Sequence, residues 1–123
     1  MEAIYQTVKK NFVEEIESGS VDILRGKSQD VMHDIESKSL DFAYIDGDHR
    51  FDGDHRFEGV LQDLEMCADK VKVRGLVVLD DHQLGGWWGD GVVRALNTFL
   101  GNHPADWRVR FVSQNQVGIL KLQ

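Results

Sequence analysis

The residues of this chain that could do chemistry gather in two acidic clusters, each placed directly after an apolar run. Residues 46–49 (DGDH) follow the run Leu40–Ile45, and residues 80–82 (DDH) follow residues 76–79. Short apolar runs that stop at polar residues are typical of buried strands. Ligands of open α/β sheets bind at the carboxyl ends of the strands. We therefore expect the two clusters to face each other across one edge of a sheet.

Such a pair of clusters favours a metal ion. Carboxylates that are held together repel one another, and a divalent cation between them removes the repulsion. Oxygen ligands favour Mg, Ca or Mn, whereas an added imidazole shifts the preference towards Mn, Fe or Zn. The same residues could instead be solvated loop carboxylates that cap the N-termini of helices. The residue types alone leave both interpretations open.

A hexapeptide, DGDHRF, occurs twice in tandem, at residues 46–51 and 52–57. Six extra residues in a surface loop cost little closure entropy, on the order of half a kcal/mol, so the fold should tolerate the repeat. We expect Asp46 to keep its place at the end of a strand and Phe57 to keep its place in a helix. Residues 49–55 should bulge out or extend an element.

Two further features near these clusters have both a functional and a structural interpretation. His49 and His55 could each act as a general base near neutral pH, although an exposed loop histidine is the alternative for at least one of them. The glycine-rich loop at residues 85–91 precedes a helix, so its amides could hold an anion. Trp87 and Trp88 could cover a substrate pocket or simply pack the loop onto the sheet.

Hydrophobic periodicity predicts that helices and strands alternate along a single domain, residues 1–123. The expected elements are a helix at 3–16, a strand at 21–24, a short helix from Ser28, a strand at Leu40–Ile45, a helix at 58–70, a strand at 76–79, a helix at 92–100, and strands at 107–112 and 117–122. This order predicts an α/β fold whose sheet is mostly parallel, with helices on both faces. The last two strands should form an antiparallel hairpin.

Composition excludes several classes of function. The net charge of the 123 residues is −7, and no cluster of Lys and Arg stands out, so nucleic acid is not an expected partner. No apolar run is long enough to cross a bilayer, and the N-terminus lacks the pattern of a signal peptide. We expect a cytoplasmic protein without membrane partners. The single cysteine, Cys67, should be a small buried hydrophobe.

Four short segments together resemble a known enzyme family: residues 45–49 (IDGDH), 57–60 (FEGV), 75–81 (GLVVLDD) and 88–92 (WGDGV). They are similar to the second half of class I S-adenosylmethionine-dependent methyltransferases. The subgroup resembled has a strand that ends D-G-D-H, an aromatic-Glu-Gly-Val helix start, and a next strand that ends Asp-Asp. The resemblance implies an incomplete Rossmann-like methyltransferase sheet that closes with the antiparallel hairpin.

The resemblance also implies a reaction and a set of site residues. The reaction is transfer of a methyl group from S-adenosylmethionine to an oxygen of a small molecule, assisted by a divalent metal such as Mg. The implied metal ligands are Asp46, Asp80 and Asp81. The implied catalytic residues are Asp46 and His49. The implied cofactor-binding residues are Gly26, Ser28, Asp46, Gly47 and Asp48.

The chain departs from this family in one respect that changes the expected function. A full enzyme of the family begins with a strand, a glycine-rich turn, a helix and a strand ending in an acid, and these segments are missing here. We therefore expect a truncated domain that binds S-adenosylmethionine weakly or not at all. The alternatives are a non-catalytic oligomerising or binding module derived from a methyltransferase half-domain, and a metal-binding hydrolase-like site.

The missing segments also predict self-association. In the family, two strands lie between those matching residues 21–24 and Leu40–Ile45. Without them, the first strand must pair directly with Leu40–Ile45, or another chain must complete the sheet. Exposed apolar strand edges recruit partners, so we expect a homodimer joined by sheet edges or helix faces, with exchanged elements as one form.

Overall fold

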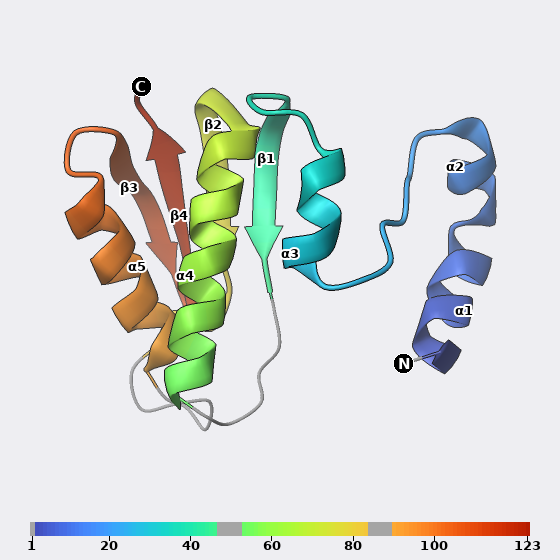
Figure 1. The fold of residues 1–123 in the computed structure, drawn as a ribbon, viewed down its shortest axis with the longest axis horizontal. Coiled ribbons are helices and arrows are strands. Elements are labelled where there is room, and N and C mark those ends of the chain that lie inside the picture. Colours follow the sequence, from blue (N-terminus) through green and yellow to red (C-terminus); the bar gives the residue numbers. More distant parts are fainter. Residues whose placement is uncertain (1, 47–52, 84–89) are drawn as a thin grey trace.

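The computed structural model describes residues 2–46, 53–83 and 90–123, except for the side chains of residues 53–56. It contains a four-stranded sheet, helices packed beside it, and a helical segment at the N-terminal end (Figure 1). The elements are α1 (Glu2–Asn11), α2 (Val13–Ser18), α3 (Ser28–Val31), η1 (Met32–Asp34), β1 (Leu40–Ile45), α4 (Gly53–Lys70), β2 (Val71–Leu79), α5 (Gly91–Asn102), β3 (Trp107–Ser113) and β4 (Gln116–Lys121). None of the described helices is both long and apolar enough to cross a membrane.

The strands are ordered β1-β2-β4-β3 across the sheet. β1 and β2 are parallel, with Ile45 opposite Leu79, whereas β4 is antiparallel to both β2 and β3. The predicted α/β class and the closing antiparallel hairpin are confirmed. β1 is an edge strand, so one side of it pairs with no strand in the part of the chain that the structure describes.

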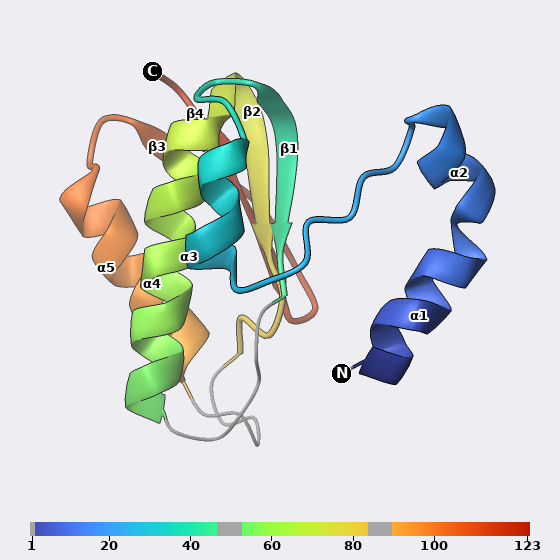
Figure 2. The same ribbon diagram turned by 45° about the vertical axis from the view of Figure 1, so that its right-hand side comes forward.

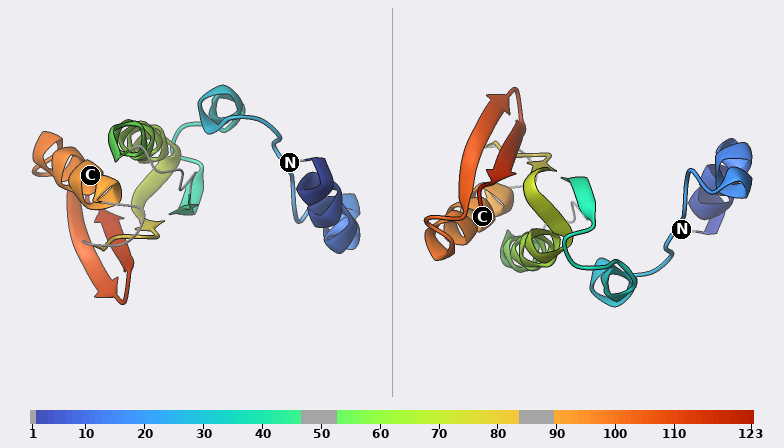
Figure 3. Two further views of the ribbon diagram at one scale, coloured as in Figure 1. Left: turned by 90° about the horizontal axis from the view of Figure 1, so that it is seen from below. Right: turned by 90° about the horizontal axis from the view of Figure 1, so that it is seen from above.

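The hydrophobic core lies between the sheet and helices that cover one of its faces. In Figure 3, α3, α4 and α5 all lie on the same side of the strands. The side chains of Phe99, Leu64, Leu79, Leu96 and Ile119 are fully buried there. The prediction of helices on both faces of the sheet is wrong for the described elements. α1 and α2 lie beyond the β1 edge (Figures 2 and 3).

The other face of the sheet carries exposed apolar side chains. Side chains alternate along a strand, and the register places Phe42 beside Leu76 and Tyr44 beside Val78 on the face opposite to the core. Phe42 is 53% exposed and Tyr44 is 46% exposed. This face is therefore apolar near the β1 edge, where no described helix covers it.

The N-terminal residues 2–25, here called the arm, depart from the predicted elements. The expected helix at 3–16 is two helices, α1 and α2, separated at Phe12. The expected strand at residues 21–24 is extended but pairs with no described strand. A strand needs the hydrogen bonds of a neighbour, and the arm lies away from β1 (Figure 1).

The arm is held together by contacts within itself. Arg25 forms an ion pair with Glu2, and its guanidinium lies 4.2 Å from the centre of the Tyr5 ring. The amide of Val21 donates a hydrogen bond to the carbonyl of Glu15. No residue of α1 or α2 is buried. The arm is thus a small unit without a hydrophobic core of its own.

The next segment, residues 28–39, is fixed firmly to α4. Its side chains and amides donate hydrogen bonds to residues along that helix: Ser28 to Asp63 (2.8 Å), Gln29 to Gln62 (2.7 Å), Ser37 to Asp69 (2.6 Å), the Lys38 amide to the Asp69 carbonyl (2.9 Å) and the Ser39 amide to the Lys70 carbonyl (2.9 Å). The boundary between the fixed segment and the arm therefore lies at Gly26 and Lys27.

The second copy of the hexapeptide begins α4. The helix starts at Gly53 rather than at residue 58, so the repeat extends an element, which was one of the two expected outcomes. Phe57 is partly buried against the core, and Arg94 lies 4.8 Å from the centre of its ring. Residues 47–52 lie outside the described part of the chain.

Strand β2 is longer than predicted. Gly75 was expected to precede the strand, but it lies inside the strand. β2 runs from Val71 to Leu79, with an irregular register between Leu40 and Phe42 of β1. A Cβ atom at Gly75 would lie 2.3 Å from Cγ1 of Val71 and 2.8 Å from the carbonyl oxygen of Lys72. Only glycine allows the backbone to approach itself this closely.

Two buried groups hold α4 against the sheet. Cys67 is 7% exposed, as predicted, and burial raises the pKa of its thiol to about 11. The ammonium group of Lys121 is buried and donates hydrogen bonds to the carbonyls of Ala68 (2.6 Å) and Val71 (2.8 Å). No local sequence pattern indicates the role of this lysine, because its two acceptors are some 50 residues earlier in the chain.

Candidate metal centre

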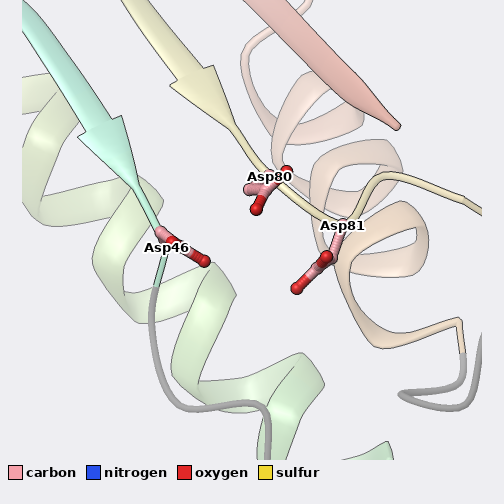
Figure 4. Close-up of side chains that lie close together, drawn as sticks. All are labelled: Asp46, Asp80 and Asp81. Carbon is pink, nitrogen blue, oxygen red and sulfur yellow. The ribbon is translucent and has the colours of Figure 1, made fainter. Parts of the chain in front are cut away.

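Three aspartates converge at the carboxyl ends of β1 and β2. One carboxylate oxygen from each of Asp46, Asp80 and Asp81 lies within 4.8 Å of one from each of the others. Figure 4 shows Asp46 reaching from the end of β1, and Asp80 and Asp81 from the end of β2, towards the space between the strands. The predicted meeting of the two acidic clusters is therefore present in the fold.

The parallel register produces this convergence. Because Ile45 pairs with Leu79, the residues that follow, Asp46 and Asp80, leave the sheet at the same level. The amide of Asp80 donates a hydrogen bond to the carbonyl of Ile45 at 3.1 Å, which ties the two strand ends together beyond the last pair of residues. The two backbones are thus fixed at the point where the carboxylates meet.

A local turn directs the third carboxylate into the group. Asp81 has a φ of 60°, in the left-handed region that aspartate tolerates better than most residues. The next amide, of His82, donates a hydrogen bond to the carbonyl of Asn115 at 2.8 Å, so the hairpin turn between β3 and β4 supports this conformation. Asp81 is only 8% exposed, whereas Asp46 is exposed.

The electrostatic effect of the three acids is visible on a neighbouring tyrosine. Burial raises the pKa of the Tyr44 hydroxyl, and the negative charges of Asp80, Asp46 and Asp81 raise this pKa further. The same hydroxyl accepts a hydrogen bond from Nε2 of Gln116 at 3.0 Å, which acts in the opposite direction. The three carboxylates thus place negative charge at the carboxyl edge of the sheet.

The donor set fits a hard divalent cation. All three groups are carboxylates, which Mg²⁺, Ca²⁺ and Mn²⁺ prefer over nitrogen or sulfur ligands. Oxygen atoms within 4.8 Å of one another can contact one ion, because such ions bind oxygen at about 2.0–2.6 Å. Asp46 is the exposed member of the three, so solvent reaches its side chain.

The sequence and the fold both match known methyltransferases. The methyltransferase domain family matches residues 2–82, about two-thirds of the chain, including the arm and all three aspartates. The chain belongs to the class I S-adenosylmethionine-dependent methyltransferase family. No curated protein matches it by sequence.

A solved methyltransferase structure has the same fold. The O-methyltransferase NovP superposes with a TM-score of 0.67 over 96% of this chain, at 20% sequence identity. The chain spans only 45% of the length of that protein. Because 96% of this methyltransferase-family chain is matched, the match includes most of the arm. The arm therefore belongs to the shared fold.

The remaining predicted site residues of this methyltransferase-family chain lie either near the start of α3 or outside the described residues. Ser28 is the first residue of α3 and Gly26 lies two residues before it. The start of α3 is at the same end of the sheet as the carboxyl end of β1 (Figure 1). The Ser28 hydroxyl donates its hydrogen bond to Asp63 of α4, so it helps to fix α3. Gly47, Asp48 and His49 lie outside the described residues, as does the glycine-rich loop with Trp87 and Trp88.

Two residues beside the three acids were missed by the sequence analysis. Tyr44 lies in the apolar strand β1, directly before Ile45. No local sequence pattern indicates that its hydroxyl lies near the three acids. Gln116 lies 72 residues later in the sequence and donates a hydrogen bond to the Tyr44 hydroxyl. Only the strand order β1-β2-β4 brings these two residues together.

Proposed function

We propose that this chain supports S-adenosylmethionine-dependent methyl transfer to an oxygen of a small molecule, with a divalent cation at the three aspartates. The observation that carries the proposal is the convergence of Asp46, Asp80 and Asp81 at the carboxyl edge of a methyltransferase sheet. Neither nucleic acid nor a membrane is part of the proposal.

In this proposal the aspartates bind the cation through their carboxylates, and Mg²⁺ fits this set of ligands. A bound divalent cation would act as a Lewis acid that orients and polarises a substrate hydroxyl. S-adenosylmethionine, when bound, would supply the methyl group to the hydroxyl oxygen, and its sulfur would keep the electron pair of the broken bond. His49 is the proposed base that takes the hydroxyl proton.

The proposal includes five cofactor-binding residues, of which Gly47 and Asp48 lie outside the described part of the chain. They are Gly26, Ser28, Asp46, Gly47 and Asp48. The start of α3 lies at the end of the sheet where β1 has its carboxyl end, which supports Gly26 and Ser28 in this role. The isolated chain should bind S-adenosylmethionine weakly, because the glycine-rich turn of the family has no counterpart in the sequence.

A matched pair of variants tests the metal site. Calorimetric titration with Mn²⁺ should give an affinity that falls by more than roughly tenfold in Asp80→Asn, which keeps the size of the side chain but removes its charge. The control is Asp41→Asn, on the same strand pair but at the amino end of β1, where Asp41 forms an ion pair with Lys72. Equal affinity in wild type and Asp80→Asn would refute the metal site.

A second function is supported by a different observation, the open edge of β1. The alternative proposal is a non-catalytic module that associates through this edge, in the form of a homodimer. Titration with S-adenosylmethionine separates the two proposals. Micromolar binding to a monomer would favour an autonomous transferase, whereas binding only to the oligomer would mean that a neighbouring copy completes the cofactor site.

A further inference from the structure

We propose that Asp63 is a positioning residue for the cofactor: it holds the proton of the Ser28 hydroxyl in a hydrogen bond, so that Ser28 offers a ligand only an acceptor. Ser28 then selects a ligand group that donates a hydrogen bond, such as an amino group, over a carbonyl oxygen in the same place. Ser28 is one of the proposed cofactor-binding residues, so this inference rests on the proposed function but not on its metal site.

The contact between Ser28 and Asp63 joins two elements across 35 positions of the sequence. Oγ of Ser28, the first residue of α3, lies 2.8 Å from Oδ1 of Asp63 in α4. This is the usual distance of a hydrogen bond between two oxygen atoms. One of the two oxygens must therefore supply the shared proton.

The charge of Asp63 fixes the direction of this hydrogen bond. An ionised carboxylate has no proton and can only accept, so the proton comes from the hydroxyl. A serine hydroxyl has one proton and two lone pairs. With its proton directed to Asp63, Ser28 has only its lone pairs left for a further partner.

The surroundings of Asp63 make this proton difficult to withdraw. Asp63 is partly buried, and burial raises the pKa of its carboxyl group, whereas the hydrogen bond from Ser28 lowers this pKa. Among the described residues, no cation is paired with this carboxylate, so the Ser28 hydroxyl is the group that stabilises its charge. Turning the hydroxyl towards another acceptor would leave a partly buried charge without its donor, which is costly.

A neighbouring contact keeps Ser28 within reach of Asp63. Nε2 of Gln29 donates a hydrogen bond to Oε1 of Gln62 at 2.7 Å. Two consecutive residues of α3 are thus bonded to two consecutive residues of α4. The start of α3 is fixed against α4 at the point where the hydroxyl must be oriented.

The position of Ser28 allows a ligand to reach it. Ser28 is exposed, and the start of α3 lies at the same end of the sheet as the carboxyl end of β1 (Figure 1). S-adenosylmethionine carries two groups that donate hydrogen bonds in the required way, the amino group of its adenine and the ammonium group of its methionine part. Both present the same chemistry to Ser28, and matched analogues distinguish them.

Titration of the free chain tests the direction of the hydrogen bond without any ligand. Ser28→Ala removes the donor that lowers the pKa of Asp63, so this pKa should rise, which carbon-13 NMR of the carboxyl group can follow. The control is Ser37→Ala, which removes the hydroxyl that donates to Asp69 at 2.6 Å and should leave the pKa of Asp63 as it is in the wild type. If the pKa of Asp63 does not rise in Ser28→Ala, Ser28 does not give its proton to Asp63, and the inference is overturned.

Binding of cofactor analogues to the full chain tests the selection. The reference ligand is S-adenosylhomocysteine, followed by NMR at millimolar concentration because weak binding is expected. S-inosylhomocysteine has a carbonyl oxygen in place of the adenine amino group, and a second analogue lacks the amino group of the homocysteine part. One of the two analogues should bind more than roughly fivefold more weakly than the reference, which identifies the donor that Ser28 accepts.

The variant Asp63→Asn shows whether Asp63 causes this selection. An asparagine amide can donate to Ser28 as well as accept from it, which releases the hydroxyl proton for a ligand. The loss of affinity for the weaker analogue should therefore shrink to less than roughly half of its wild-type value. The control is Asp69→Asn, which alters a similar serine–aspartate bond in the last turn of α4 and should keep the full selection. Circular dichroism checks that both variants fold.

The outcomes separate this inference from the proposed function. Equal selection in the wild type and in Asp63→Asn, or no selection in the wild type, would overturn the role of Asp63 while the cofactor still binds. If the wild type does not bind S-adenosylhomocysteine at all, the proposed cofactor-binding role of Ser28 fails, and the inference fails with it.

Discussion

The amide of Asp80 donates a hydrogen bond to the carbonyl oxygen of Ile45, 3.1 Å away, across the ends of two parallel strands. This bond continues the β1–β2 ladder by one step beyond the pair Ile45 and Leu79. Asp46 and Asp80, the first residues after the two strands, are thereby held at a fixed separation. The sheet therefore sets the separation of Asp46 and Asp80, whereas the turn at Asp81 positions the third carboxylate.

Tyr44 should report cation binding through its hydroxyl. Burial and the charges of Asp80, Asp46 and Asp81 hold its pKa above the ordinary value. A cation between the acids would cancel the negative charge that disfavours the phenolate, so the pKa should fall. Absorbance titration in a Tyr5→Phe background should show the phenolate forming at lower pH with Mn²⁺ than without it. In Asp80→Asn the pKa should already be lower and should respond less to Mn²⁺.

Replacing Lys121 by methionine should destabilise the fold. Its ammonium group supplies hydrogen bonds to the carbonyls of Ala68 and Val71, and their loss would leave both acceptors without this donor. We expect the free energy of unfolding to fall by about 1–3 kcal/mol. Urea denaturation gives this value, and Lys10→Met, on an exposed turn of α1, should change it little. Equal stability of the two variants would contradict the role of Lys121.

Replacing Gly118 by alanine should disturb the uncovered face of the sheet. A Cβ atom there would lie 2.2 Å from Cε1 of Phe111, so the ring must move. Such overpacking costs about 1–3 kcal/mol. The matched control is Gly101→Ala in α5, where nothing lies within 4 Å, and a gain of about 0.5–1 kcal/mol is expected in a helix.

The double variant Gly118→Ala with Phe111→Ala provides a second check on that contact. Removing the ring should recover most of the loss caused by Gly118→Ala, since no group would then occupy the space of the new methyl. If thermal denaturation shows that the two losses simply add, the ring of Phe111 does not lie over Gly118.

Deleting residues 52–57 should leave the fold intact. The first hexapeptide copy remains attached to β1, and Phe51 would take the place of Phe57 next to Glu58. The stability should change by little more than the loop-closure term, on the order of half a kcal/mol. A deletion of equal length at residues 58–63 is the control, because it removes Val60 and Leu61 from the core side of α4. Loss of cooperative unfolding in the first deletion would show that the repeat is structural.

The parts of the fold that were predicted correctly depend on local patterns. Apolar runs that stop at Asp46 and Asp80 marked the ends of two strands, and the rule that consecutive parallel strands are neighbours then placed the acids together. The hairpin of β3 and β4 was likewise visible from two runs around a short turn. These signals lie within a few residues of the structures that they specify.

The errors arise where a distant partner decides the local structure. Residues 21–24 have the composition of a strand, but no described strand pairs with them, so they remain extended without a ladder. The contact between Tyr44 and Gln116 depends on strand order, which no local pattern encodes. The polar repeat is compatible with either a loop or a helix, so the sequence left open whether it would bulge out or extend α4, which begins at Gly53.

The buried thiol of Cys67 can be used to measure how often the core opens. It is the only cysteine, it lies between α4 and the sheet, and its raised pKa keeps the thiol protonated in the folded state. A thiol reagent can therefore modify it only when α4 lifts from the sheet. The rate of labelling under native conditions would measure how often that layer opens, without any engineered probe. Comparing the labelling rate at several protein concentrations would show whether self-association slows the opening of the core.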